Sequence, residues 1–69
     1  MSSLKETFGE RVRARRKELG MTQADLAKAT GIHQPDICVL ESGEHAPNLD
    51  TVERVAKALK IDHKILLTD

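Results

Sequence analysis

Several features that mark particular classes of protein are scarce or missing in this 69-residue sequence. It has one cysteine, Cys38, which excludes an internal disulfide framework and fits a reducing cytoplasm. No apolar run approaches the roughly 18 residues of a membrane span, and the start MSSLKETFGERV lacks the apolar core of a signal peptide. We therefore expect a soluble, cytoplasmic protein with no membrane partner that forms one small domain.

Aromatic residues and strand patterns are nearly absent as well. Phe8 is the single aromatic residue, and no stretch alternates β-branched with polar residues for long enough to indicate a strand. Glycine and proline instead separate short segments whose apolar residues have helical spacing. This pattern predicts an all-α fold, a single compact five-helix domain over residues 4–69, preceded by a flexible N-terminus at residues 1–3.

Caps and apolar spacing define the five predicted helices. Their ranges are 4–19, 22–30 including the cap, 34–42, 49–60 and 63–67. Thr22 begins TQAD, a helix-start signature with Asp25 at the third position, and Pro35 fits because it lies in a first turn. Asn48 and Asp62 cap the last two helices. The residues predicted to face the core are Phe8, Val12, Leu19, Ala24, Leu26, Ala27, Thr30, Ile37, Leu40, Leu49, Val52, Val55, Ala56, Leu59, Ile65 and Leu66.

Basic residues are missing from one part of the chain, although the net charge is zero. Residues 1–28 hold seven Lys and Arg against four Asp and Glu, a net charge of +3. Residues 29–53 hold none against five, a net charge of −5, and residues 54–69 hold four against two, a net charge of +2. Such a bipolar surface suits a partner that is gripped by one face only, although charge runs are usually solvated helix faces.

The sequence offers no catalytic or metal-binding pattern. Its three histidines, His33, His45 and His63, stand at no metal-ligand spacing and have no cysteine pair nearby. A phosphate-binding glycine loop, a nucleophile elbow and paired carboxylates are all missing. We therefore expect a protein that is not an enzyme and that needs no metal or cofactor.

A basic segment precedes the two central helices. In RVRARRK the basic side chains surround one helix, so they cannot all face one partner. They are Arg11, Arg13, Arg15, Arg16 and Lys17. Either they form a solvated helix face, or some of them meet the phosphates of a nucleic acid.

Nearly the whole chain, about residues 6–67, resembles the Cro and lambda-repressor-type (Xre-type) helix-turn-helix family. The resemblance rests on LGMTQADLA, then GIHQPDICVLESG with the pattern G-I-x-Q-x-x-I-x-x-L-E-x-G, then PNLDTVERVAKAL, in this order and at these spacings. It implies a lambda-repressor-like domain in which helices 2 and 3 form the helix-turn-helix. The third helix would then lie in the major groove of double-stranded DNA.

The resemblance also implies roles for single residues. The base contacts would be Gln34, Pro35, Asp36 and Val39. The resemblance, together with the remaining positive charge of the chain, implies seven phosphate contacts: Thr22, Gln23, Arg11, Arg13, Lys17, His33 and Ser42. Lys28 would add to the positive charge. Arg16 and Glu41 match an ion pair of the family and are assigned to structure, because breaking a buried pair typically costs about 3–5 kcal/mol.

Some positions depart from the family's usual pattern. The family often carries arginine or lysine around Val39, Ser42 and Glu44, where this chain is uncharged or acidic, and Asp36 on a groove face repels phosphates. We therefore expect weaker DNA binding than usual, with a shallower dependence on salt. His33 stands where the family often has serine or threonine and is a poorer helix cap, although Asp36 could reach back to that helix end.

Two functions are compatible with the sequence. The first is a sequence-specific transcriptional regulator, repressor-like, that binds as a homodimer to a two-fold symmetric site and dimerises through its last helices. The dimer surface would then be Ile61, Ile65, Leu66 and Leu67. The second is an antitoxin-like or adaptor protein whose acidic residues meet a basic, toxin-like partner; these residues are Asp36, Glu44, Asp50 and Glu53. The first is the stronger hypothesis, and it places the protein in the cytoplasm, associated with the nucleoid when DNA-bound.

Overall fold

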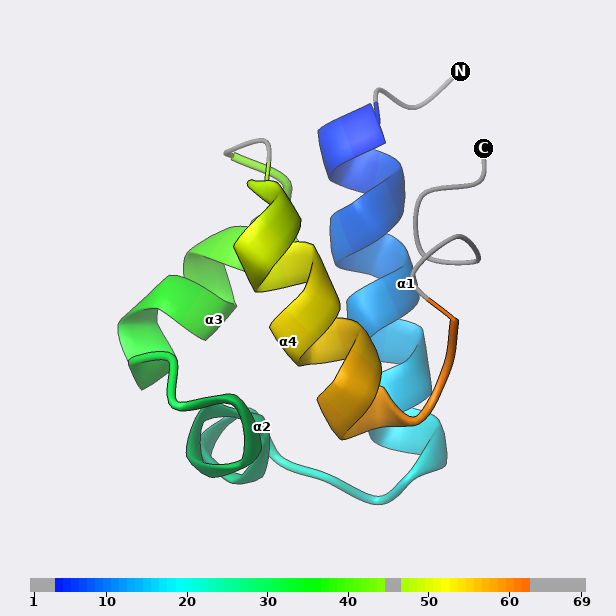
Figure 1. Cartoon of the computed structure of the whole chain (residues 1–69), viewed down its shortest axis with the longest axis vertical. Helices are drawn as coiled ribbons and strands as arrows, with labels where there is room; N and C mark the ends of the chain where they lie inside the picture. Colours follow the sequence, from blue (N-terminus) through cyan, green and yellow to red (C-terminus); the bar gives the residue numbers. More distant parts are fainter. Residues whose placement is uncertain (1–3, 45–46, 63–69) are drawn as a thin grey trace.

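The computed structural model describes residues 4–44 and 47–62, and for residues 4–6 it describes the backbone alone. Within these ranges the chain forms four helices and no strand (Figure 1). They are α1 (Leu4–Glu18), α2 (Gln23–Thr30), α3 (Gln34–Ser42) and α4 (Leu49–Leu59). The all-α prediction is confirmed, and these helices match the predicted ranges to within one residue at each end. The described part of the chain thus has four helices where five were predicted, and both the fifth helix (63–67) and the flexible N-terminus (1–3) fall outside the described residues.

Each of the first two helices packs against both of the last two. α1 packs against α3 and α4, and α2 packs against the same two helices. α2 and α3 follow each other across a short turn, while α4 lies in front of α1 in the view of Figure 1. Gly31 makes the turn possible because it ends α2 with a φ of 75°, a conformation that glycine adopts without strain. This arrangement gives the predicted helix-turn-helix.

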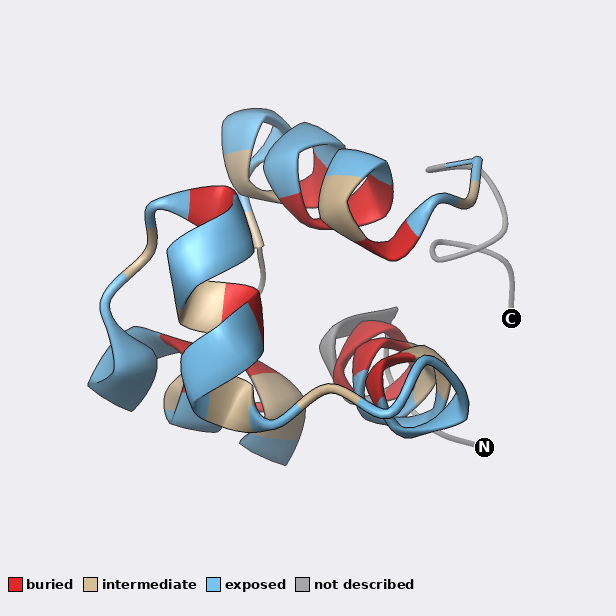
Figure 2. Ribbon diagram, turned by 90° about the horizontal axis from the view of Figure 1, so that it is seen from below, coloured by how far each residue is buried: buried red, intermediate tan, exposed pale blue. Residues whose placement is uncertain are grey.

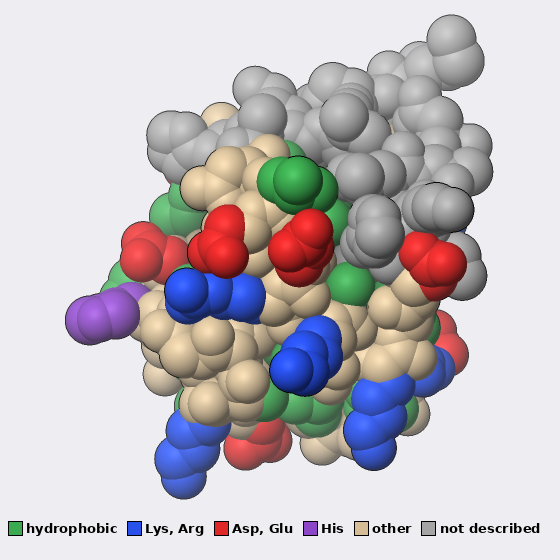
Figure 3. All heavy atoms as spheres, viewed as in Figure 1, with side chains coloured by type: hydrophobic (Ala, Val, Ile, Leu, Met, Phe, Trp, Pro, Cys, Tyr) green, Lys and Arg blue, Asp and Glu red, His purple; other side chains and the backbone are tan. Residues whose placement is uncertain are grey.

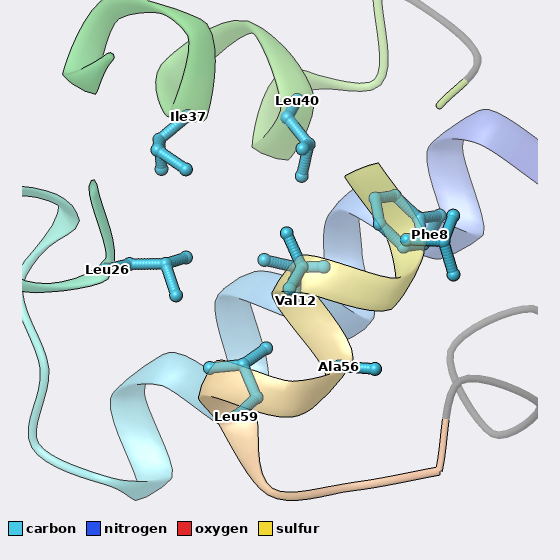
Figure 4. Close-up of a cluster of buried hydrophobic side chains, with 9 residues drawn as sticks. Phe8, Val12, Leu26, Ile37, Leu40, Ala56 and Leu59 are labelled. Carbon is cyan, nitrogen blue, oxygen red and sulfur yellow. The ribbon is translucent and has the colours of Figure 1, made fainter. Parts of the chain in front are cut away.

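One hydrophobic core joins the four helices. Its buried members are Phe8, Val12, Leu26, Ile37, Leu40, Val52, Val55, Ala56 and Leu59. Figure 4 shows side chains from all four helices pointing toward a common centre. Figure 2 shows the same division from outside, with the buried residues on the inward side of each helix and the exposed residues on the outer side.

Three of the residues predicted to face the core are exposed instead, so those predictions are wrong. Leu19 is 38% exposed and Leu49 is 63% exposed, and Ala24 is also exposed. All three lie at or next to the end of a helix, where the apolar spacing continues but none of the four described helices covers the side chain. Ile65 and Leu66, which were predicted to be buried, lie outside the described residues.

Local hydrogen bonds fix where the helices begin. The Thr22 hydroxyl accepts the N–H of Asp25 at 3.0 Å, and the Asp25 carboxylate accepts the N–H of Thr22 at 2.9 Å, which completes the predicted capping box of α2. Asn48 caps α4 by accepting the N–H of Thr51 at 2.8 Å. His33 precedes α3 but makes no side-chain cap bond. The two helices with polar caps therefore begin where the sequence predicts.

Candidate nucleic-acid interface

The outer face of α3 carries the residues predicted to contact bases. Gln34, Pro35 and Asp36 are exposed in its first turn, and Val39 is half-buried one turn further on. The opposite side of α3 is fixed in the core by Ile37 and Leu40. α3 therefore presents a polar first turn on a rigid support.

An ion pair holds α3 against α1. The Arg16 guanidinium donates two hydrogen bonds to the Glu41 carboxylate, from Nε at 2.7 Å and from Nη2 at 3.1 Å, and Nη1 donates to the carbonyl of Met21 at 2.8 Å. The Arg16 and Glu41 side chains are only 9% and 4% exposed. The hydrogen bond from Arg16 to Glu41 raises the pKa of Arg16, so the arginine stays charged. Neither charge is available to DNA.

Gln23 connects the start of α2 to the same ion pair by a hydrogen bond. Its Nε2 donates to Glu41 Oε1 at 3.3 Å, so one carboxylate contacts residues from both α1 and α2. A glutamine amide carries two N–H donors and a carbonyl. The second N–H donor of Gln23 is therefore left for the predicted phosphate contact, and the bond to Glu41 limits where it can point.

A shallow hollow of about 230 Å³ lies between α1, α2 and α3. Its lining residues are Arg13, Arg16, Gln23, Cys38, Glu41 and Ser42. Arg13 is exposed, and its side chain makes no hydrogen bond or ion pair within residues 4–44 and 47–62. The Ser42 hydroxyl donates to the carbonyl of Val39 at 2.6 Å, so it faces the hollow as an acceptor. Cys38 was not among the predicted contacts, yet it follows Gln34 by one helical turn and shares the hollow with three predicted phosphate contacts.

The other arginines of α1 lie on a different face. Arg15 donates from Nε to the carbonyl of Leu59 at the end of α4, at 3.0 Å, and pairs weakly with Glu18 at 3.5 Å. Arg11 lies one turn before Arg15 on the same face, and its Nε is buried without a hydrogen-bond partner in the described part of the chain. The structure therefore separates Arg11 from the hollow that contains Arg13, whereas Lys17, four residues after Arg13, is exposed on the same side.

The capping box of α2 makes stability depend on pH. The hydrogen bond from the backbone N–H of Thr22, with a smaller contribution from the Thr22 side chain, holds the pKa of the Asp25 carboxyl below its usual value. A lowered folded-state pKa means that the stabilisation is present above the unfolded-state pKa of about 3.9 and is lost as pH falls through the folded value. We expect the melting temperature of the wild type to exceed that of Asp25→Asn at pH 6 and the difference to shrink below about pH 4. A difference that stays constant from pH 6 to pH 2.5 would contradict this assignment.

The outer face of α4 is divided by charge. Asp50 and Glu53 lie in its first half, and Arg54, Lys57 and Lys60 lie at or beyond its second half. Figure 3 shows this face, with Asp and Glu side chains gathered above and Lys and Arg side chains below. Asp50 pairs with Arg54 at 3.0 Å, and both are largely exposed. Part of the predicted acidic surface is therefore already neutralised within its own helix.

Other kinds of site find little support in the described residues. No group of three or more His, Cys, Asp and Glu side chains in residues 4–44 and 47–62 is placed to hold a metal ion. Among the helices in those ranges, none is both long and apolar enough to cross a membrane.

Several known proteins with similar sequences are named as regulators or repressors. Residues 12–66 match the family described as Helix-turn-helix. The chain is 42% identical over 52 residues to an uncharacterized HTH-type transcriptional regulator of Methanothermobacter thermautotrophicus, and the matched region covers 75% of each protein. It is 39% identical over 62 residues to the repressor protein C2 of Salmonella phage P22, and that matched region covers 90% of this chain and 29% of the repressor. These similar proteins are named as regulators rather than enzymes, which favours a non-enzymatic role.

A solved structure extends the similarity to the fold. The crystal structure of the P22 c2 repressor protein in complex with a synthetic operator superimposes with a TM-score of 0.84 at 37% identity, over 97% of both chains. The described helices therefore have the arrangement of a repressor domain that was crystallised on an operator.

Proposed function

The chain belongs to the Helix-turn-helix family (HTH_3) of the Cro and lambda-repressor type, and from this premise we propose that it is a sequence-specific, repressor-like DNA-binding regulator. The observation that supports the proposal most strongly is which polar side chains around α3 are already paired within the protein and which are exposed and unpaired. Arg16 and Glu41 form an ion pair with each other, and both side chains are almost fully buried. Gln34 and Arg13 are exposed, and their side chains make no hydrogen bond or ion pair within the described ranges.

In this proposal α3 lies in the major groove. Gln34 pairs with an adenine edge, which matches its amide donor and acceptor. Pro35 and the half-buried Val39 offer apolar surface to a thymine methyl group. Because the core fixes the other side of α3, these side chains approach the bases from a rigid support.

The phosphate contacts come from both sides of α3. Thr22 and Gln23 stand at the start of α2, whose N-terminal dipole favours an anion, and Arg13 and Lys17 add positive charge from α1. His33 is exposed at the turn, and Ser42 would have to turn its hydroxyl away from Val39 in order to donate to a phosphate. Arg11 has the weakest support of the predicted contacts, because it lies on the face of α1 that carries Arg15.

Arg13 and Arg11 provide a matched pair of variants. Removing one phosphate contact lowers the slope of log affinity against log salt by about 1. We expect Arg13→Ala to show this change and to weaken binding to all sequences about equally. Arg11→Ala should leave the slope unchanged, provided that circular dichroism shows it to be folded. Equal slope changes in the two variants would contradict the proposed orientation of α1.

One small module rarely supplies enough affinity and specificity alone, so we include a homodimer on a two-fold symmetric site in the proposal. Ile61, the one member of the predicted dimer surface within the described residues, is half-buried and packs against the core. The other members, Ile65, Leu66 and Leu67, lie outside them. We place the protein in the cytoplasm, where such a regulator meets DNA.

Selection of bound sequences from a random DNA pool, at low and then physiological salt, tests the proposal. We expect an enriched two-fold symmetric motif for the wild type and for Cys38→Ala. Gln34→Ala should lose preference at one base pair of each half-site, a cost of about 1–3 kcal/mol. Binding without any motif would refute sequence-specific regulation, and the exposed acids Glu44 and Glu53 would then favour an antitoxin-like or adaptor role with a basic protein partner.

A further inference from the structure

α2 and α3 each carry an aspartate as their third residue, and the two carboxylates have different surroundings. In α2, the carboxylate of Asp25 accepts the N–H of Thr22 at 2.9 Å and closes the capping box. In α3, Asp36 is exposed, and its carboxylate accepts no hydrogen bond and forms no ion pair within residues 4–44 and 47–62. The expectation that Asp36 reaches back to cap α3 is therefore wrong.

The first turn of α3 also has few free N–H donors. Pro35 has no N–H. The N–H groups of Asp36 and Ile37 both donate to the carbonyl of His33, at 2.9 and 3.1 Å. At most the backbone N–H of Gln34 remains free. This helix start therefore presents an unpaired carboxylate, whereas the carboxylate at the start of α2 is paired within its capping box.

Such a helix start suits a hydrogen-bond donor and not a phosphate. An ionised carboxylate can only accept hydrogen bonds, so it is repelled by phosphate oxygens and by the acceptors of guanine and thymine in the major groove. Cytosine presents its N4 amino group there with no acceptor on the same base. Adenine presents an amino group beside the N7 acceptor, a pair that suits the amide of Gln34 better than a carboxylate.

We propose that Asp36 is a specificity-determining residue that accepts a hydrogen bond from the N4 amino group of a cytosine in each half-site. The inference rests on the proposed DNA-binding function and deepens it, because it names the base that the acidic residue selects. The carboxylate then acts against binding to most sequences, because it repels the phosphates and the base acceptors. A hydrogen bond offsets this repulsion only where an amino group faces the carboxylate.

The test begins with selection from a random pool by the wild type, Asp36→Ala and Asp36→Asn. We expect one C·G pair in each half-site of the wild-type motif to lose its preference in Asp36→Ala, while the rest of the motif is kept. Asp36→Asn should move that preference toward adenine, which an asparagine amide can pair bidentately. Both variants should bind DNA without the motif more tightly than the wild type, because a charge that repels phosphates is gone.

A single chemical group in the DNA then tests the contact directly. In the selected duplex, the cytosine is replaced by 2-pyrimidinone, which lacks the N4 amino group, and affinity is measured by fluorescence anisotropy. We expect the wild type to lose roughly 5- to 150-fold, the range of one good base contact, and Asp36→Ala to lose less than about 2-fold. Asp36 is exposed, so both variants should fold, as circular dichroism will show.

The outcomes separate the inference from the function on which it rests. A symmetric motif whose base preferences are the same in all three proteins would overturn the role of Asp36 and leave the proposed function standing. A motif in which the position governed by Asp36 is adenine would overturn the choice of cytosine. The absence of any motif for the wild type would overturn both.

Discussion

Glu41→Gln should lower the free energy of unfolding by about 3–5 kcal/mol, the largest effect we expect from a single conservative substitution in this chain. The Glu41 carboxylate accepts two hydrogen bonds from Arg16 and one from Gln23. Removing its charge leaves the Arg16 guanidinium, only 9% exposed on its side chain, without a counter-ion. For a small domain with a total stability of about 5–15 kcal/mol, such a loss is a large part of the total. Urea denaturation at pH 7 measures it.

Two further variants show whether the loss comes from the unpaired charge. Glu44→Gln, an exposed acid just after α3, should change stability by less than about 0.5 kcal/mol. The double variant Arg16→Met, Glu41→Leu removes both charges, and it should recover much of the stability because apolar residues replace the buried pair. If Glu41→Gln is as stable as Glu44→Gln, the ion pair is not what holds α3 to α1.

Gly9→Ala should destabilise the domain by about 3 kcal/mol, at the upper end of what overpacking costs. Gly9 lies where α1 crosses α3, and a Cβ there would stand 2.6 Å from the carbonyl oxygen of Leu40 and 2.9 Å from that of Glu41. Both atoms belong to the backbone of α3, so the two helices must separate to make room. The effect opposes helix propensity, since alanine in place of glycine within a helix ordinarily gains about 1 kcal/mol. Thermal and urea unfolding will show the sign.

Ala14→Gly is the matched control for this prediction. Ala14 is exposed on the same helix, so exchanging it for glycine should cost about 1 kcal/mol, the ordinary propensity difference. Both substitutions should then destabilise the protein although they exchange the same two residues in opposite directions. A stabilised Gly9→Ala variant would show that α1 and α3 do not approach as closely as the structure places them.

The features that the sequence predicted well are local ones. The Thr22 capping box and the Asn48 cap depend on residues three apart, so they can be recognised from spacing alone. The glycine turn between α2 and α3 is equally local. The ion pair between Arg16 and Glu41 joins residues 25 apart, and it could be anticipated only from the resemblance to the family.

The features that the sequence did not predict depend on which helices meet. Nothing near Gly9 indicates that another helix crosses there, and nothing near Arg15 indicates a bond to Leu59, which is 44 residues away. Leu19 and Leu49 continue the apolar spacing of their helices, but no neighbouring helix covers them. The acidic character of α3 could be read from the sequence, whereas its unpaired Asp36 carboxylate required the hydrogen bonds of the first turn.

If α3 and the start of α2 face DNA, binding must change the reactivity of Cys38, the single cysteine of the chain. It is exposed on α3 and lines the hollow with Arg13 and Gln23, so DNA bound as proposed must cover it. The measurement is the rate of alkylation by iodoacetamide with and without the selected duplex. A Cys38→Ser, Glu53→Cys variant places the thiol on the outer face of α4 as a control. We expect DNA to slow the reaction of Cys38 and not that of the α4 thiol. Unchanged reactivity of Cys38 in a fully bound complex would place the DNA on another face of the protein.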